Sequence, residues 1–202
     1  MKRRMTEWTV EDIWLSVCDS VPVIKDRIAA KITKNICAHF NRVRLRWPAV
    51  RRYCEDNPEI VLWERPLPER TKGLTIYKNG MFIVAFNSKI QTATGRVRIV
   101  LHELGHYLLH RSFLEQGAVK RANNDWFADQ FEKEADLFAL MAMAPDCEIK
   151  AICKQTPAFG SAMDVLMEEY GFPEEDAVVR LAAFDPNLRK SSYQEAFGRF
   201  IE

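Results

Sequence analysis

The sequence lacks a long apolar run, a sizeable net charge and a paired cysteine spacing. No stretch approaches the roughly 20 apolar residues of a membrane-spanning helix, and the charged segment Met1 to Trp14 has no apolar signal region. A net charge of +1 gives no overall field that attracts nucleic acid or a membrane surface. Five cysteines, an odd number without metal-site spacing, are expected to be reduced thiols. These absences predict a cytoplasmic protein with no membrane partner and no direct nucleic-acid binding.

Carboxylates are also missing from one part of the chain. No Asp or Glu lies between Asp26 and Glu55, and the densest part of this gap contains five arginines: Arg42, Arg44, Arg46, Arg51 and Arg52. A solvated face explains such a run, and a docking patch for an acidic partner is the alternative. Few aromatic residues interleave these arginines, so nucleic-acid binding is the weakest interpretation.

A length of 202 residues suits one domain with a sizeable core, and an apolar content of 48% is ordinary for a globular protein. Apolar residues four apart predict two helices over residues 10 to 40, divided at Pro22, and Pro48 suits the first turn of a short helix from Trp47 to Glu55. We therefore predict a single domain over 1–202, with a helical N-terminal region 1–57.

The apolar pattern then changes to that of strands and returns to helices. Glu59 to Trp63 is short and apolar, and Leu74 to Phe86 alternates around Asn79-Gly80, a strong hairpin signal. Helices are expected over about 94–110 and about 125–143, followed by shorter ones in a helical C-terminal region 146–202. This order predicts an α+β domain, with a small sheet of about three strands packed on helices.

The segment from Ile99 to His110 carries the chemistry. His102 and His106 are four residues apart on one helical face, so both imidazoles can reach one metal ion. Glu103 follows the first histidine, and on such helices this carboxylate is the general base toward a water that zinc activates. The helix is apolar, and an unpaired buried histidine or carboxylate would be costly there, which argues against a chance match. His110 is interpreted as a helix-end group.

A metal site of this kind needs a third protein ligand. The segment from Phe131 to Asp136 offers three carboxylates, Glu132, Glu134 and Asp136. Glu132 and Asp136 are four residues apart, so one can bind the metal while the other orients a histidine. Glu134 shares the opposite face with three phenylalanines, and periodicity alone does not decide among these carboxylates.

Together these segments resemble the ImmA/IrrE family of metallopeptidases. The matching pieces are Ile76-Tyr77, Ile83 to Asn87, Arg98 to His110, and the Glu-x-Glu-Ala-Asp-x-Phe-Ala segment that leads to Pro145. The resemblance implies a zincin-like fold in which Glu132 joins His102 and His106 as a ligand of Zn²⁺, with Asp136 behind them. It also implies intracellular proteolysis of a regulator, often a helix-turn-helix repressor of a mobile element or stress response.

We therefore expect a zinc-dependent metalloendopeptidase that hydrolyses a cytoplasmic regulatory protein, such as a helix-turn-helix transcriptional repressor. The alternative is a metal-binding regulatory module that acts by protein contact without proteolysis. The presence of Glu103 favours the enzyme, because a pure binding module has no need of that carboxylate. A peptide is cleaved in an extended form, so we expect the strand from Met81 to Phe86 to lie at the sheet edge facing the site and to hold the substrate by main-chain hydrogen bonds.

Overall fold

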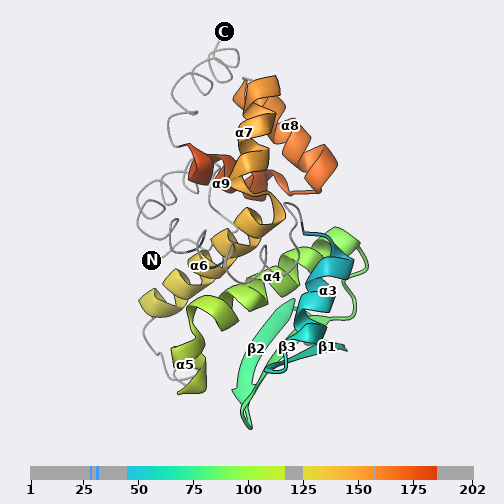
Figure 1. Cartoon of the computed structure of the whole chain (residues 1–202), viewed down its shortest axis with the longest axis vertical. Coiled ribbons are helices and arrows are strands. Elements are labelled where there is room, and N and C mark those ends of the chain that lie inside the picture. Colours follow the sequence, from blue (N-terminus) through green and yellow to red (C-terminus); the bar gives the residue numbers. More distant parts are fainter. Residues whose placement is uncertain (1–27, 29–30, 32–44, 117–124, 157, 186–202) are drawn as a thin grey trace. The chain divides into compact units, whose positions relative to one another are not determined.

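The computed structural model describes residues 28, 31, 45–116, 125–156 and 158–185, with the backbone alone for 125–129 (Figure 1). The chain divides into two compact units. The sheet unit is Ile28–Met143, and the helical unit comprises Met1–Arg27 and Ala144–Glu202. The helices expected over residues 10 to 40 lie almost entirely outside the described residues. The helical region 1–57 and the single domain over 1–202 therefore stay predictions.

The sheet unit contains three strands in the part of the chain that the structure describes. They are β1 (Ile60–Arg65), β2 (Gly73–Lys78) and β3 (Met81–Asn87), in the spatial order β1-β3-β2. β3 pairs in parallel with β1 and antiparallel with β2. Asn79 and Gly80 join β2 to β3 with φ of 55° and 82°, the left-handed pair that a two-residue hairpin requires. The predicted hairpin and small sheet are confirmed.

The prediction that the strand from Met81 to Phe86 lies at the edge of the sheet is wrong. β3 is the central strand, and Val84 lies opposite Leu62 of β1 on one side and Thr75 of β2 on the other. The physical reason is the nearly continuous apolar sequence of β3, which suits a strand covered on both faces, whereas β2 contains exposed residues. Among the described strands, β1 and β2 form the edges of the sheet.

Four helices of the sheet unit are described: α3 (Trp47–Asp56), α4 (Ala93–Leu109), α5 (Arg111–Glu115) and α6 (Asp125–Met143). The side chain of Thr92 starts α4 by accepting a hydrogen bond of 3.1 Å from the Gly95 backbone N–H. α4 contacts α3, α6, β2 and β3, and Figure 1 shows it lying between α6 and the sheet. α4 is therefore the central element, and both neighbouring layers can bring side chains to it.

The core of the sheet unit lies between β3 and α4. Phe82, Val84 and Phe86 are buried on the face of β3 that α4 covers, and the Phe82 ring lies 4.8 Å from the Tyr107 ring. On its other side α4 approaches α6 closely, because a Cβ atom at Gly105 would lie 3.0 Å from the Ala135 Cα. This packing fixes the rotation of α4, and with it the direction of each side chain that α4 carries.

The described part of the helical unit contains α7 (Asp146–Gln155), α8 (Phe159–Tyr170) and α9 (Glu174–Phe184). Its core includes Val178 and Ala182 of α9, which pack against Phe159 and Met163 of α8. The buried Arg180 side chain donates to the Ala144 carbonyl over 2.6 Å and pairs with Asp146. Among the described residues, no helix combines the length and the apolar character needed to cross a membrane.

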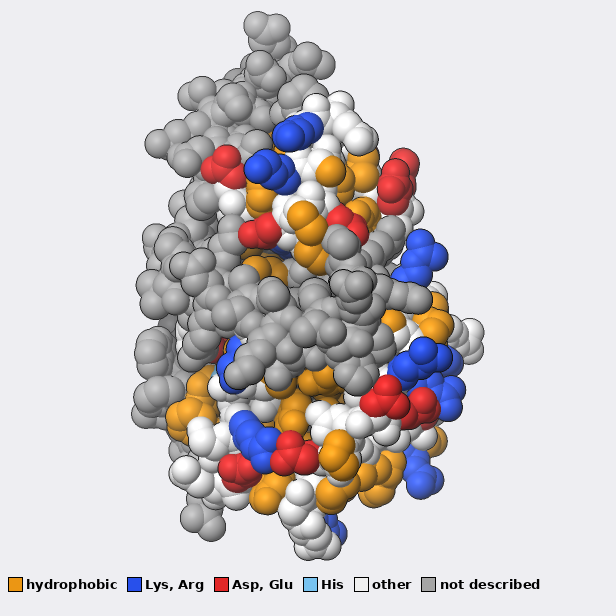
Figure 2. All heavy atoms as spheres, in the orientation of Figure 1, with side chains coloured by type: hydrophobic (Ala, Val, Ile, Leu, Met, Phe, Trp, Pro, Cys, Tyr) orange, Lys and Arg blue, Asp and Glu red, His pale blue; other side chains and the backbone are white. Residues whose placement is uncertain are grey.

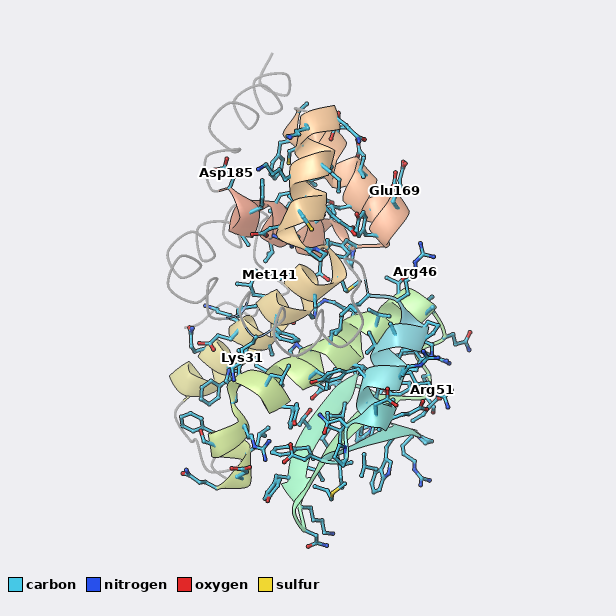
Figure 3. The ribbon with its side chains drawn as sticks, in the orientation of Figure 1. Lys31, Arg46, Arg51, Met141, Glu169 and Asp185 are labelled. Carbon is cyan, nitrogen blue, oxygen red and sulfur yellow. The ribbon has the colours of Figure 1, made fainter. Side chains whose placement is uncertain are left out.

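The overall class is α+β, as predicted from the order of the elements. Of the arginine run, Arg46, Arg51 and Arg52 are described and exposed. Arg46 and Arg51 project outward at the start of α3 and along it (Figure 3), and Arg51 pairs with Glu55 at 2.7 Å. Figure 2 shows acidic side chains beside the basic ones that gather on the right flank of the visible face, which fits the interpretation of these arginines as a solvated face.

Candidate metal centre

Two helices bring the three predicted ligands together. His102 and His106 are one turn apart on α4, and their Nε2 atoms are 3.1 Å apart. Glu132 of α6 faces both rings, with its Oε2 atom 3.2 Å from His102 Nε2 and its Oε1 atom 3.4 Å from His106 Nε2. The three side chains therefore point at one position between α4 and α6.

Their spacing fits a tetrahedral metal ion. Zinc–ligand bonds of about 2.0–2.1 Å at tetrahedral angles separate two donor atoms by roughly 3.3 Å. The nitrogen–nitrogen distance of 3.1 Å and the nitrogen–oxygen distances of 3.2 and 3.4 Å agree with this separation. Among the described residues, this is the one group of three side chains found close enough together to hold a metal ion. Two imidazoles and one carboxylate leave a fourth position, as in catalytic zinc sites. That these residues bind a metal stays a prediction.

Asp136 lies behind His102, where the resemblance placed it. Its Oδ1 atom is 2.8 Å from His102 Nδ1 and 2.9 Å from Arg98 Nη2. A proton on His102 Nδ1 that is donated to Asp136 leaves the Nε2 lone pair free for a metal. Burial alone would raise the pKa of Asp136, but His102 and Arg98 together lower it, so the carboxylate stays ionised.

The charges of the site favour a cation at the point where the ligands meet. Hydrogen bonds from His102 and His106 hold the pKa of Glu132 well below its usual range. Burial lowers the pKa of His102, yet its hydrogen bonds to Asp136 and Glu132 raise it overall to about 9. In the absence of metal, a proton satisfies this preference for positive charge, so metal binding competes with protonation.

The carboxylate of Glu103 lies against β2, near enough to His102, His106 and Glu132 to interact with them electrostatically. The Glu103 side chain is buried, and the Thr75 hydroxyl donates to Glu103 Oε2 over 2.7 Å. Gly73 lies so near that an added Cβ would be 2.4 Å from Glu103 Oε1. Burial raises the pKa of this carboxyl, with opposing effects from His102 and Thr75. A desolvated carboxylate with a raised pKa is suited to accept a proton near neutral pH.

Four residues around the site have contacts there that the sequence did not predict. Gly73 and Thr75 enclose Glu103, and identifying them requires the register of β2 against α4, which sequence spacing does not contain. His110 was expected at a helix end, which is confirmed because it is the C-cap of α4, and Glu134 was left on the opposite face of its helix. In the structure His110 contacts both His106 and Glu134. The spacing of four between His106 and His110, which repeats that of His102 and His106, was the available signal.

Comparison with known proteins gives one finding. A model of the peptidase M78 family, described as the IrrE N-terminal-like domain, matches residues 55–182, which is more than half of the chain. The matched range includes every residue of the metal centre and the strands beside it. Neither the curated proteins nor the solved structures yield a match.

Proposed function

Because the chain belongs to the peptidase M78 family of IrrE N-terminal-like domains, we propose that it is a zinc-dependent endopeptidase that hydrolyses a regulatory protein in the cytoplasm. Membership confirms the resemblance found in the sequence, and with it a zincin-like fold and a metallopeptidase-like function. The proposal adds the metal, the reaction on a protein substrate, and the class of substrate, a helix-turn-helix repressor of a mobile element or stress response.

One observation carries this proposal: a buried glutamate follows the first of two histidines that share a carboxylate ligand. His102, His106 and Glu132 would hold the ion, and zinc supplies a Lewis acid that makes a water nucleophilic near neutral pH. Glu103 takes the proton of the attacking water and then delivers it to the amine of the leaving peptide. The Thr75 hydroxyl, 2.7 Å from Glu103 Oε2, keeps the carboxylate in one orientation during both transfers.

The edge of β2 is the proposed site for an extended substrate. Lys72 bonds to β3 through its carbonyl, which accepts from Asn87 N–H over 2.9 Å. In an antiparallel pair, the backbone N–H and C=O groups of successive residues point alternately toward the partner strand and away from it. The register therefore directs the backbone groups of Gly73, Thr75 and Tyr77 away from β3, toward the outer edge of the sheet. Thr75 therefore touches Glu103 with its side chain while its backbone faces the edge. This arrangement moves the expected substrate strand from β3 to β2.

The alternative function is a metal-binding regulatory module that acts by contact without proteolysis. Such a module needs the three ligands but gains nothing from a buried carboxylate next to them. Glu103 is held by Thr75 and closely approached by Gly73, which is an arrangement specific to that carboxylate. The structure of the site thus favours the enzyme.

Metal analysis and substrate capture test the proposal. The purified protein should contain one zinc per chain, and Glu103→Gln should keep the zinc while losing proteolysis. The inactive variant should retain intact substrate from a cell extract, and adding wild-type protein should cleave the captured substrate unless a chelator is present. Captured proteins that the zinc-loaded wild type leaves intact would support the contact-only alternative. Cleavage by a folded, metal-free protein would refute zinc dependence.

A further inference from the structure

A buried hydrogen-bonded chain extends from His106 into the protein. His110 Nδ1 lies 3.1 Å from His106 Nδ1, and His110 Nε2 lies 3.2 Å from Glu134 Oε2. Gln130 continues the chain by donating to Glu134 Oε1 over 3.1 Å. The side chains of His110 and Glu134 are only 2% and 8% exposed. Polar groups buried to this degree are costly unless they are paired, so the chain is a specific feature of the fold.

The surroundings of His110 hold its ring in place. The ring stacks on Phe131 of α6, with centroids 4.3 Å apart and an interplanar angle of 28°. Its backbone ends α4 by donating to the His106 carbonyl over 2.9 Å, and the next residue begins α5. The ring therefore cannot turn away from His106 without disturbing the packing of α6 and the junction between α4 and α5.

The direction of each hydrogen bond follows from the chemistry of the groups. If His106 offers its Nε2 lone pair to a metal, its proton lies on Nδ1 and is donated to His110 Nδ1. His110 then carries its proton on Nε2 and donates it to Glu134, which as a carboxylate can only accept. Gln130 donates to the other oxygen of Glu134. These directions give both ring nitrogens of His110 a consistent role, and they leave the Nε2 of His106 for the ion.

We propose that His110 and Glu134 are positioning residues, which fix the ring orientation and tautomer of His106 so that it binds the metal through Nε2. This inference rests on the metal site of the proposed function. It gives each metal-binding histidine its own carboxylate, because Asp136 contacts His102 directly whereas Glu134 reaches His106 through His110. Loss of such an outer contact weakens metal binding by about 10- to 100-fold.

A matched pair of substitutions at His110 tests this relay. The amide of His110→Asn places an acceptor near the position of Nδ1, so it can still accept from His106. The longer His110→Gln places its amide near the position of Nε2, so it can still donate to Glu134 but no longer supports His106. Both variants lose the ring stacking on Phe131, which matches them for packing.

We expect the two variants to differ in zinc affinity but not in the stability of the metal-free protein. His110→Gln should bind zinc about tenfold or more weakly than His110→Asn in a chelator competition assay, while the metal-free variants unfold at similar temperatures. Equal zinc affinities in the two variants would refute the role of His110 and Glu134 but not the proposed function. A folded wild type that binds no zinc would refute the proposed function, and the relay with it.

The wild-type protein provides a second measurement if either variant fails to fold. Nitrogen-15 NMR of the zinc-loaded protein should show His106 bound through Nε2, with a scalar coupling across the Nδ1–H···Nδ1 hydrogen bond to His110. A purely structural pair of His110 and Glu134 requires neither signal. Zinc bound through His106 Nδ1, or a protonated His110 Nδ1, would overturn the proposal.

Discussion

At the scale of single residues, the proposed general base, Glu103, is oriented by neighbours that have no proposed chemical role. Thr75 donates to the carboxylate of Glu103, and Gly73 leaves the space that this carboxylate occupies. Both belong to β2, the strand whose outer edge is proposed to hold the substrate. In the proposed function, one short strand would set both the orientation of the base and the position of the peptide bond to be cleaved.

Gly73→Ala should displace Glu103 without removing a metal ligand. The new Cβ would lie 2.4 Å from Glu103 Oε1 and 2.7 Å from the Ile99 side chain, so at least one of them must move. We expect a loss of about 1–3 kcal/mol in the free energy of unfolding, the usual cost of overpacking. Zinc content should stay at the wild-type level while proteolysis of the captured substrate falls. Thermal unfolding, metal analysis and a cleavage assay measure the three effects.

Gly160→Ala is the matched control for this substitution. An added Cβ at Gly160, in α8, has nothing within 4 Å, and alanine favours a helix over glycine by up to about 1 kcal/mol. The two Gly→Ala changes should thus shift stability in opposite directions. A Gly73→Ala protein as stable and active as the wild type would show that the contact with Glu103 has no consequence.

Glu59 should make stability depend on pH in the acidic range. Arg111 donates to its carboxylate over 2.6 and 2.9 Å and Tyr107 over 3.0 Å, which together lower its pKa from 4.5 to about 2. A carboxyl whose pKa is depressed by folding stabilises the protein fully above its ordinary pKa. This stabilisation is lost as the pH falls from about 4.5 toward about 2.

The unfolding temperatures of wild type and Glu59→Gln should therefore differ most near neutral pH and converge as the pH falls below about 4.5. Glu69→Gln, at an exposed position, serves as the control. Its difference from the wild type should be small throughout. A difference for Glu59→Gln that stays constant from neutral to acidic pH would contradict the depressed pKa.

At the scale of helices, the metal centre depends on how closely α4 and α6 approach. Two candidate ligands come from α4 and one from α6, and Gly105 lies where α4 approaches α6 closely. The added Cβ of Gly105→Ala would be 3.0 Å from the Ala135 Cα and 3.2 Å from the Phe138 Cβ. A backbone atom cannot rotate aside as a flexible side chain can, so the helices must separate.

Gly105→Ala should accordingly weaken zinc binding as well as the fold. We expect about 1–3 kcal/mol of destabilisation in the metal-free protein, together with a lower zinc affinity because Glu132 moves away from His102 and His106. Thermal unfolding and chelator competition measure these two effects. Destabilisation with unchanged zinc affinity would mean that Glu132 follows the histidines, or that it is not a ligand.

The same helices show how far sequence alone can reach. The turn-by-turn geometry of α4 makes His102 and His106 neighbours whatever surrounds them, so their spacing predicted the pair. The choice between Glu132 and Glu134 depends on the rotation of α6 against α4, which is set by Gly105 and Ala135, and only the family resemblance supplied it.

The sheet has a similar limit. The Asn79-Gly80 signal predicted the pairing of β2 with β3, because a two-residue turn determines which strands are adjacent. The parallel pairing of β1 with β3 joins strands far apart in sequence, and no local signal specifies it. For this reason β3 was expected at the edge, although its apolar sequence was compatible with the centre.

At the scale of the whole molecule, the range matched by the family model does not coincide with either of the two compact units. The matched residues 55–182 run from α3 through most of α9 and so include residues of both compact units. All three candidate ligands, together with Glu103, belong to the sheet unit Ile28–Met143. A bound zinc would thus join elements of one unit only, and its removal should show whether the two units unfold separately or together.

Removal of zinc should loosen the sheet unit while leaving the helical unit protected. A ligand that binds only the folded form stabilises that form, by about 2.7 kcal/mol when its free concentration is 100 times its dissociation constant. Chelation should therefore speed amide hydrogen exchange in α4 and α6, which carry the ligands. Peptides from α8 and α9 are the internal control, because the described core of their unit contains no candidate ligand. Equal acceleration in all four helices would show that both units open together as a single domain, as the sequence predicted. Acceleration in neither pair would show that the metal contributes nothing to the stability of the fold.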